Sequence, residues 1–223
     1  MIAGATLIAA LGGAAPASAW WAETGAYRTG SFGYVDVHGV PGEHSDLVVT
    51  GDETLTPSHV VWVRDRSAPA TPAPDGRGEG CTQVGTHVLR CVAPDYFPGG
   101  PEPTFTYLGI DLGDGRDRVE IPFTTPLFVY GSTGPGNDTV VNHSSDGATL
   151  ELGEGNDRVT LRGSDSGFLP NDQVNGNEGD DVIDVFNGSA DDAPGCGDGQ
   201  DVLYADVGED NPDCETRYPH PKL

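Results

Sequence analysis

Short runs of alternating apolar and polar residues recur along the chain, each bounded by turn-forming residues. In the first half these runs fall at residues 32–37, 47–50, 59–64, 88–92 and 104–110, and they are rich in Val, Tyr, Phe or Trp. Alternation with a period of two is typical of half-buried β-strands, and no sustained helical period accompanies it. Residues 67–80 are rich in Pro and Gly, which predicts an exposed loop. The pattern predicts an all-β protein.

The second half of the chain repeats one pattern. Between residues 109 and 207, Gly-x-Gly-x-Asp-x-hydrophobic occurs in LGDGRDRVE, TGPGNDTVV, LGEGNDRVT and CGDGQDVLY, and GNEGDDVID departs only in having Asn177 at the first Gly. The motif aspartates are 19 to 24 residues apart. A fixed period near 20 residues predicts a solenoid, whose units bury their apolar face only by stacking on one another.

The motif combines residue types that suit a calcium ion. Its two glycines permit a sharp turn with positive φ, which aims main-chain carbonyls inward, and its aspartate adds a charged oxygen. Calcium takes six to eight oxygen ligands, many of them carbonyls. The hydrophobic residue that follows starts a strand whose side chain points into the core. One motif therefore predicts part of a metal site and one strand.

The five motifs resemble the hemolysin-type calcium-binding repeats of RTX proteins, G-G-x-G-x-D-x-U-x, over about 95 residues. The resemblance implies a right-handed parallel β-roll in which calcium lies between same-side turns of adjacent coils, held by the motif aspartate and turn carbonyls. The implied metal-site aspartates are Asp117, Asp138, Asp157, Asp181 and Asp201. The implied turn glycines are Gly113, Gly115, Gly134, Gly136, Gly153, Gly155, Gly179, Gly197 and Gly199.

The chain departs from that family in its period. A full coil of the family carries two motifs, whereas here each interval holds one motif and one plain turn, at residues 122–126, 143–148, 162–172 and 187–195. We therefore expect one calcium ladder on one side, with at most four inter-turn sites and the weakest motif at Asn177. Residues 42–48 echo the motif except for His44, with Asp46 at the aspartate position. The Gly80–Gly85 run and the cysteines resemble short exported actinobacterial proteins of this class.

The remaining segments frame the repeats. Residues 1–19 are uncharged and end in Ala-Ser-Ala, which predicts a signal peptide and a secreted, extracellular protein. Residues 20–108 are expected to form a β-rich cap or leading coils, or else an independent binding domain; residues 109–207 form the repeats. Three pairings of the four cysteines are possible, and the local pairs Cys81–Cys91 and Cys196–Cys214 need the least loop closure. The second pair would close the tail at 208–223.

Charge and motifs exclude several functions. The formal charge of −24 argues against nucleic acid and anionic membrane surfaces and favours a cationic partner such as a metal ion. Neither HExxH nor GxSxG occurs, no other segment predicts a membrane span, and no catalytic site is expected. The sequence predicts a secreted calcium-binding repeat protein. The alternatives are a calcium-stabilised carrier for a polysaccharide-active or adhesive domain at 20–108, or a structural protein with metal-free motifs. No protein or polysaccharide partner is identified.

Overall fold

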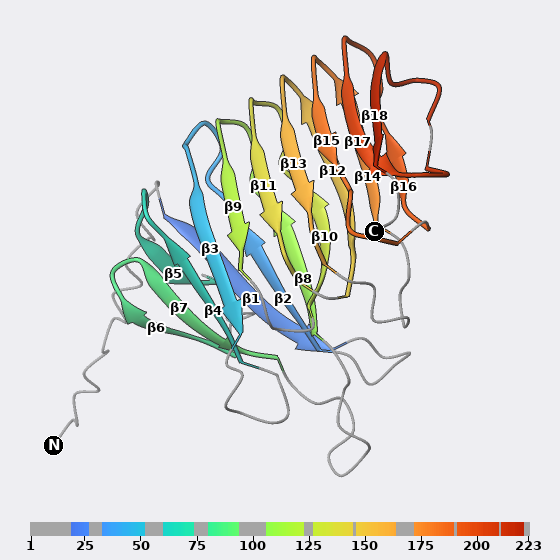
Figure 1. Ribbon diagram of the computed structural model, residues 1–223. Coiled ribbons are helices and arrows are strands. Elements are labelled where there is room, and N and C mark those ends of the chain that lie inside the picture. The colour runs from blue at the N-terminus through green and yellow to red at the C-terminus, as the bar shows by residue number, and fades with distance from the viewer. Residues whose placement is uncertain are drawn as a thin grey trace, which may run out of the picture.

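The computed structural model describes residues 19–26, 33–51, 60–73, 80–93, 106–122, 127–144, 146–163, 172–189, 191–209 and 211–220. This part of the chain is all-β and forms two sheets (Figure 1). The eight-stranded sheet runs in the order β16 (Ala193–Gly195), β14 (Gln173–Glu178), β12 (Ala148–Glu154), β10 (Leu127–Ser132), β8 (Thr106–Asp111), β2 (Gly33–His38), β1 (Trp20–Ala26), β5 (Ala70–Pro72). The ten-stranded sheet runs β18 (Thr216–His220), β17 (Val202–Asp206), β15 (Val182–Asp184), β13 (Arg158–Leu161), β11 (Thr139–Asn142), β9 (Arg118–Ile121), β3 (Asp46–Gly51), β4 (Val60–Asp65), β7 (Val88–Val92), β6 (Cys81–Gly85).

From β8 to β17 the strands alternate between the two sheets. Each pair, such as β8 and β9 or β10 and β11, adds one layer, and every layer pairs in parallel with the next. The register matches equivalent motif positions, because Val140 of β11 lies between Val119 of β9 and Val159 of β13. All three side chains are fully buried. The motif valines therefore stack into an apolar column between the sheets, as period-two alternation requires.

The first half of the chain continues both sheets. β2 pairs in parallel with β8, and β3 pairs in parallel with β9, so these two strands occupy the position of one more layer. Beyond them the pairing becomes antiparallel, from β2 to β1 and from β3 through β4 and β7 to β6. The sheets are therefore mixed.

One apolar core extends through both halves. It includes Trp20 and Val35 from the first half and Leu150 and Leu203 from the repeats, all with at most 1% of their surface exposed. Burying such side chains is the main favourable term in folding, at about 25 cal/mol per Å² of apolar surface. The described residues contain no helix that is long and apolar enough to cross a membrane.

The structure corrects part of the sequence prediction in the first half. Residues 67–80 were expected to be an exposed loop, but 70–72 form β5, which pairs with β1, and Ala70 is buried. β1 and β6 were not predicted. Pro72 is compatible with β5 because this strand lies at a sheet edge, where a missing N–H costs little. The predicted signal peptide lies outside the described residues except for Ala19.

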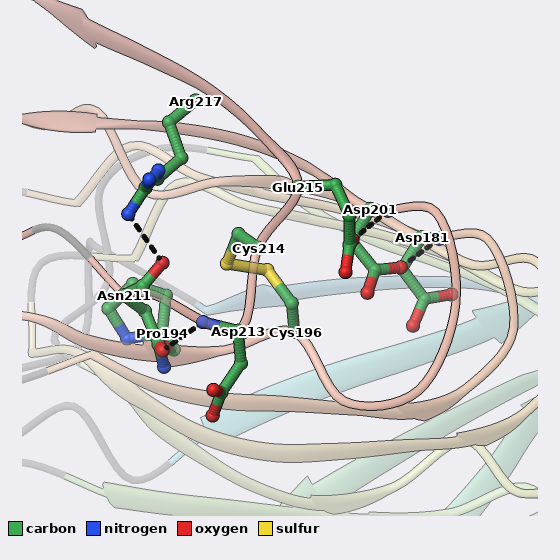
Figure 2. The surroundings of a disulfide bond; sticks show 9 residues. All are labelled: Asp181, Pro194, Cys196, Asp201, Asn211, Asp213, Cys214, Glu215 and Arg217. Atoms are coloured by element: carbon green, nitrogen blue, oxygen red, sulfur yellow. Dashed lines mark hydrogen bonds between the residues drawn. A yellow bond between two sulfur atoms is a disulfide. The ribbon is translucent and has the colours of Figure 1, made fainter.

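Both local disulfides are present. Cys81 and Cys91 are directly opposite each other on β6 and β7. Cys196 and Cys214 join the last motif to the tail, as Figure 2 shows. Beyond Cys214 the chain returns as β18, which pairs in parallel with β17. The predicted pairing is confirmed, and the tail covers the last layer of the ten-stranded sheet.

The two sheets have four edge strands, and three of them contain a proline. The edge strands β5, β16 and β18 contain Pro72, Pro194 and Pro219. The fourth edge strand, β6, has none.

Candidate functional site

The motif turns connect the two sheets along one side of the stack, the upper edge in Figure 1. Their glycines lie directly above one another. A Cβ added to Gly155, whose φ is +134°, would lie 1.4 Å from the carbonyl oxygen of Gly136. Only glycine permits such close stacking.

The same stacking applies to the other predicted turn glycines. A Cβ at Gly134, Gly136, Gly153, Gly179, Gly197 or Gly199 would lie 1.8 to 2.3 Å from a carbonyl oxygen of the preceding layer, and Gly113 and Gly115 stand at the start of the series. Asn177 takes the first-glycine position of the fourth motif with φ +71°. Asn tolerates this conformation better than other non-glycine residues, so the turn is kept.

The motif aspartates form a column that runs from layer to layer, which we call the inner column. At each step the backbone N–H of one aspartate donates to the Oδ1 of the next. The N···O distances are 2.7 Å from Asp117 to Asp138 and from Asp138 to Asp157, and 2.8 Å from Asp157 to Asp181 and from Asp181 to Asp201. The structure therefore brings all five predicted aspartates together in sequence order.

The second carboxylate oxygen of each aspartate has a different environment. All five residues expose at most 2% of their surface, and the Oδ2 atoms of Asp117, Asp138, Asp157, Asp181 and Asp201 are buried without a hydrogen-bond partner among the described residues. A buried polar atom without a partner costs free energy, and more so when it carries charge. The column therefore contains five oxygen atoms that need a proton or a cation.

Burial raises the pKa values of the inner-column aspartates. Desolvation raises the pKa of Asp117 and of Asp181 to about 7, although each carboxylate accepts a backbone N–H bond that acts in the opposite direction. The pKa of Asp157 rises to about 6 for the same reason. Burial also raises the pKa of Asp138 and of Asp201. At neutral pH the inner column thus contains carboxylates that resist ionisation.

The inner column is longer than the motifs predicted. The backbone N–H of Asp201 donates to Glu215 Oε2 at 2.9 Å, and these residues lie side by side in Figure 2. This backbone N–H lowers the pKa of the exposed Glu215. Glu215 directly precedes β18, as each motif aspartate precedes its strand, but no glycine pair marks it in the sequence. A search for the Gly-x-Gly-x-Asp motif therefore does not find Glu215.

At the other end the column reaches Ser45. Its backbone N–H donates to Asp117 Oδ1 at 2.6 Å. The sequence had aligned Asp46 with the motif aspartates, but Asp46 pairs with Arg118 and the equivalent of Asp117 is Ser45. That prediction was wrong by one residue, so no carboxylate occupies the position equivalent to Asp117 in this layer, although the buried carboxylate of Asp65 lies near Asp117.

A second column lies beside the first on the exposed side of the turns. Here the hydrogen bonds run in the opposite direction, because the backbone N–H of each later layer donates to the side chain of the earlier one. Asn156 N–H donates to Asn137 Oδ1 at 2.9 Å, Asp180 N–H to Asn156 Oδ1 at 3.1 Å, and Gln200 N–H to Asp180 Oδ1 at 2.9 Å. We call these residues the outer column. Asparagine and aspartate are interchangeable in it.

The opposite side of the stack was expected to carry plain turns, and this is wrong near the C-terminal end. Asp172 N–H donates to Asp192 Oδ1 at 3.0 Å, and Asp192 N–H donates to Glu209 Oε1 at 3.0 Å. All three side chains are buried. Asp172 and Asp192 directly precede strands, and Glu209 lies three residues after β17. None of the three follows a Gly-x-Gly, so the motif search missed them.

The inner column fits a calcium ion in chemistry and in charge. Each layer offers a buried carboxylate oxygen beside turn carbonyls, and calcium prefers a mixture of these ligands. Across the described ranges, no group of three or more His, Cys, Asp or Glu side chains is placed to hold a metal. Carbonyl oxygens would therefore have to supply most of the ligands.

Comparison with known proteins found no matching family model, curated protein or solved structure.

Proposed function

We propose that this chain is a secreted calcium-binding repeat protein of the RTX type, stabilised by calcium held between its stacked motif turns. The observation that carries the proposal is the set of five buried Oδ2 atoms of the inner column, which no described donor satisfies. Calcium is the ion that the resemblance implies and that oxygen-only ligands favour. The proposal assigns the chain a binding function and no reaction.

The inner column would hold the ion with two kinds of ligand. Asp138, Asp157 and Asp181 each have acidic neighbours on both sides, so they would contribute Oδ2 to sites between layers, together with carbonyls of the glycine turns. Bound calcium supplies positive charge that offsets desolvation and mutual repulsion of the carboxylates. Metal that binds only the folded form adds to folding free energy.

We assign the layered stack to a right-handed parallel β-roll. Alternation of strands between two sheets, parallel pairing of each layer with the next and a period near 20 residues support this assignment. The two disulfides are compatible with an extracellular protein. The core that continues from β2 into β8 favours leading coils over an independent carrier domain at 20–108.

A second candidate is a structural protein whose inner column is neutralised by protons instead of calcium. The raised pKa of Asp117 and of Asp181, to about 7, favours it, because partial protonation would occur at neutral pH. In this case calcium would be dispensable for folding.

Calorimetric titration and circular dichroism distinguish the calcium-binding protein from the proton-neutralised one. We expect the purified protein to bind calcium in preference to magnesium, which dehydrates reluctantly, and to lose thermal stability in EGTA. Asp181→Asn should weaken calcium binding. Asp180→Asn is the matched control, because Asp180 is the exposed outer-column neighbour and Asn156 already performs its role one layer earlier. An unchanged melting temperature with calcium and EGTA would contradict the proposal and favour the proton-neutralised protein.

A further inference from the structure

Aromatic residues gather on one outer surface of the eight-stranded sheet. Trp21 of β1, Tyr34 of β2, Tyr107 of β8, and Phe128 and Tyr130 of β10 all occupy outward positions and are partly exposed. We call this surface the aromatic face. The repeat strands β11 to β16 contain no aromatic residue at all. Within the eight-stranded sheet the aromatic residues are thus confined to four neighbouring strands, next to one another in Figure 1.

Tyr107 contacts two other rings of this face. Tyr34, Tyr107 and Phe128 share one row across β2, β8 and β10. The ring of Tyr107 meets that of Phe128 at a centroid distance of 5.6 Å and that of Tyr130 at 6.1 Å, both edge-to-face. Such contacts stabilise the rings in fixed orientations. Tyr107 is therefore nearly perpendicular to both Phe128 and Tyr130, at interplanar angles of 72° and 76°.

A glycine makes room for the central ring. Tyr130 reaches across β8 to β2, where its hydroxyl donates to Asp36 Oδ1 at 2.5 Å. Its path passes over Gly109, because a Cβ there would lie 2.9 Å from Tyr130 Cζ and 2.8 Å from its hydroxyl oxygen. The ring end thus lies against the backbone of β8, on the outer side of the sheet. Gly109 permits this close approach.

The face also carries polar groups, among them the imidazole of His38, which stacks on Trp21 at a centroid distance of 3.9 Å. Glu23 and Asp36 are direct cross-strand partners on β1 and β2, beside Tyr130. β1, β2, β8 and β10 contain no Lys or Arg. The ten-stranded sheet, in contrast, carries Arg64, Arg90, Arg118 and Arg158 on outward positions. The aromatic face would repel an anionic polymer, and its carboxylates would accept hydrogen bonds from hydroxyl groups.

We propose that the aromatic face binds a neutral polysaccharide of β-1,4-linked, gluco-configured sugars. In such sugars the hydroxyl groups are equatorial, so each ring has flat C–H faces that stack on aromatic rings, and its edge hydroxyls donate to Asp36 beside Tyr130. Four strands at about 4.8 Å spacing give a platform about 14 Å wide, enough for a few linked sugars. The surface is separate from the inner column, so the proposal does not depend on calcium binding.

Retention on insoluble cellulose and chitin tests this directly. We expect the protein to sediment with at least one of the two. Tyr107→Ala and Tyr130→Ala should each weaken retention about 5- to 10-fold, as expected for the loss of one stacked ring. Tyr130→Phe keeps the ring and should stay within about threefold of the wild type. Tyr218→Ala is the control, since Tyr218 is exposed and stacks on Tyr204 in the other sheet.

Two outcomes would overturn the proposal: no retention of the wild-type protein, or equal loss in Tyr218→Ala and Tyr130→Ala. Tyrosine-dependent binding to poly-lysine in place of both polysaccharides would also overturn it, because the acidic pair would then select a cationic peptide. Circular dichroism and calcium titration of every variant establish that it is folded. They also keep this test independent of the calcium proposal.

Discussion

Replacing one carboxylate of the inner column by an amide should change stability in opposite directions with and without calcium. In Asp157→Asn, the amide oxygen can still accept the N–H of Asp138, now 2.7 Å from Oδ1. The buried Oδ2, which has no described partner, becomes an NH₂ group. The substitution therefore removes a charge and a metal ligand while the number of unsatisfied polar groups stays the same.

The magnitude follows from the acidity of Asp157. Its pKa is 3.8 unperturbed and about 6 in the folded protein. Because folding raises the pKa, the stabilising contribution is fully present below pH 3.8 and is lost as the pH rises through 6. The full difference corresponds to at most about 3 kcal/mol at neutral pH. Solvent near the exposed turns screens part of it, so we expect about 1–2 kcal/mol.

Thermal unfolding at two pH values and two calcium levels measures this effect. In EGTA at pH 7.5, Asp157→Asn should melt about 3–6 °C above the wild type. At pH 4 in calcium-free buffer the difference should nearly vanish, because Asp157 is then largely protonated in the folded protein. In saturating calcium at pH 7.5 the order should reverse, since the variant has lost a ligand. If the variant melts below the wild type in EGTA at pH 7.5, the buried charge is not destabilising and the reasoning fails.

Three further predictions test the column, the turns and the tail. Asp138→Asn should remove more bound calcium than Asp117→Asn in a calorimetric titration, because Asp138 lies between two motif aspartates and Asp117 has a motif aspartate on one side only; equal losses would contradict sites between layers. Gly155→Ala should lower the free energy of unfolding in urea by at least about 2 kcal/mol, whereas Gly188→Ala, which also has positive φ but open space around it, should cost about 1 kcal/mol; similar costs would show that stacking is not the constraint. Replacing Cys196 and Cys214 by Ser should cost about 3 kcal/mol and raise hydrogen exchange in β17 and β18 but not in β9 and β11; uniform exchange would mean that the tail does not act locally.

The repeat pattern predicted much of the molecule because one motif determines both a turn and a strand. The positive φ of Gly134 and the burial of Val140 both follow from Gly-x-Gly-x-Asp-x-hydrophobic. Asn177 adopts φ +71°, which an asparagine side chain tolerates, while the weaker calcium binding expected of its motif stays a prediction. The backbone conformation there is preserved without the expected glycine.

What the sequence did not predict depends on contacts between distant residues. Ser45 and Glu215 are inner-column members through strand register, and neither has the glycine pair. Asp192 and Glu209 lie in turns with no repeated pattern. β5 is short, is bounded by prolines and forms only because it pairs with β1. Local sequence does not encode these tertiary partners.

The prolines at the sheet edges determine how copies of this chain can associate. A stack of sheets with an open edge at each end can add chains head to tail without limit, which produces fibres. Here the C-terminal edges carry Pro194 and Pro219, and the edge strand β5 carries Pro72. β6 alone among the four edge strands has no proline, and its Val84 is 51% exposed. Pairing through β6 would use the same edge of both molecules, so such an assembly closes at two chains and cannot elongate.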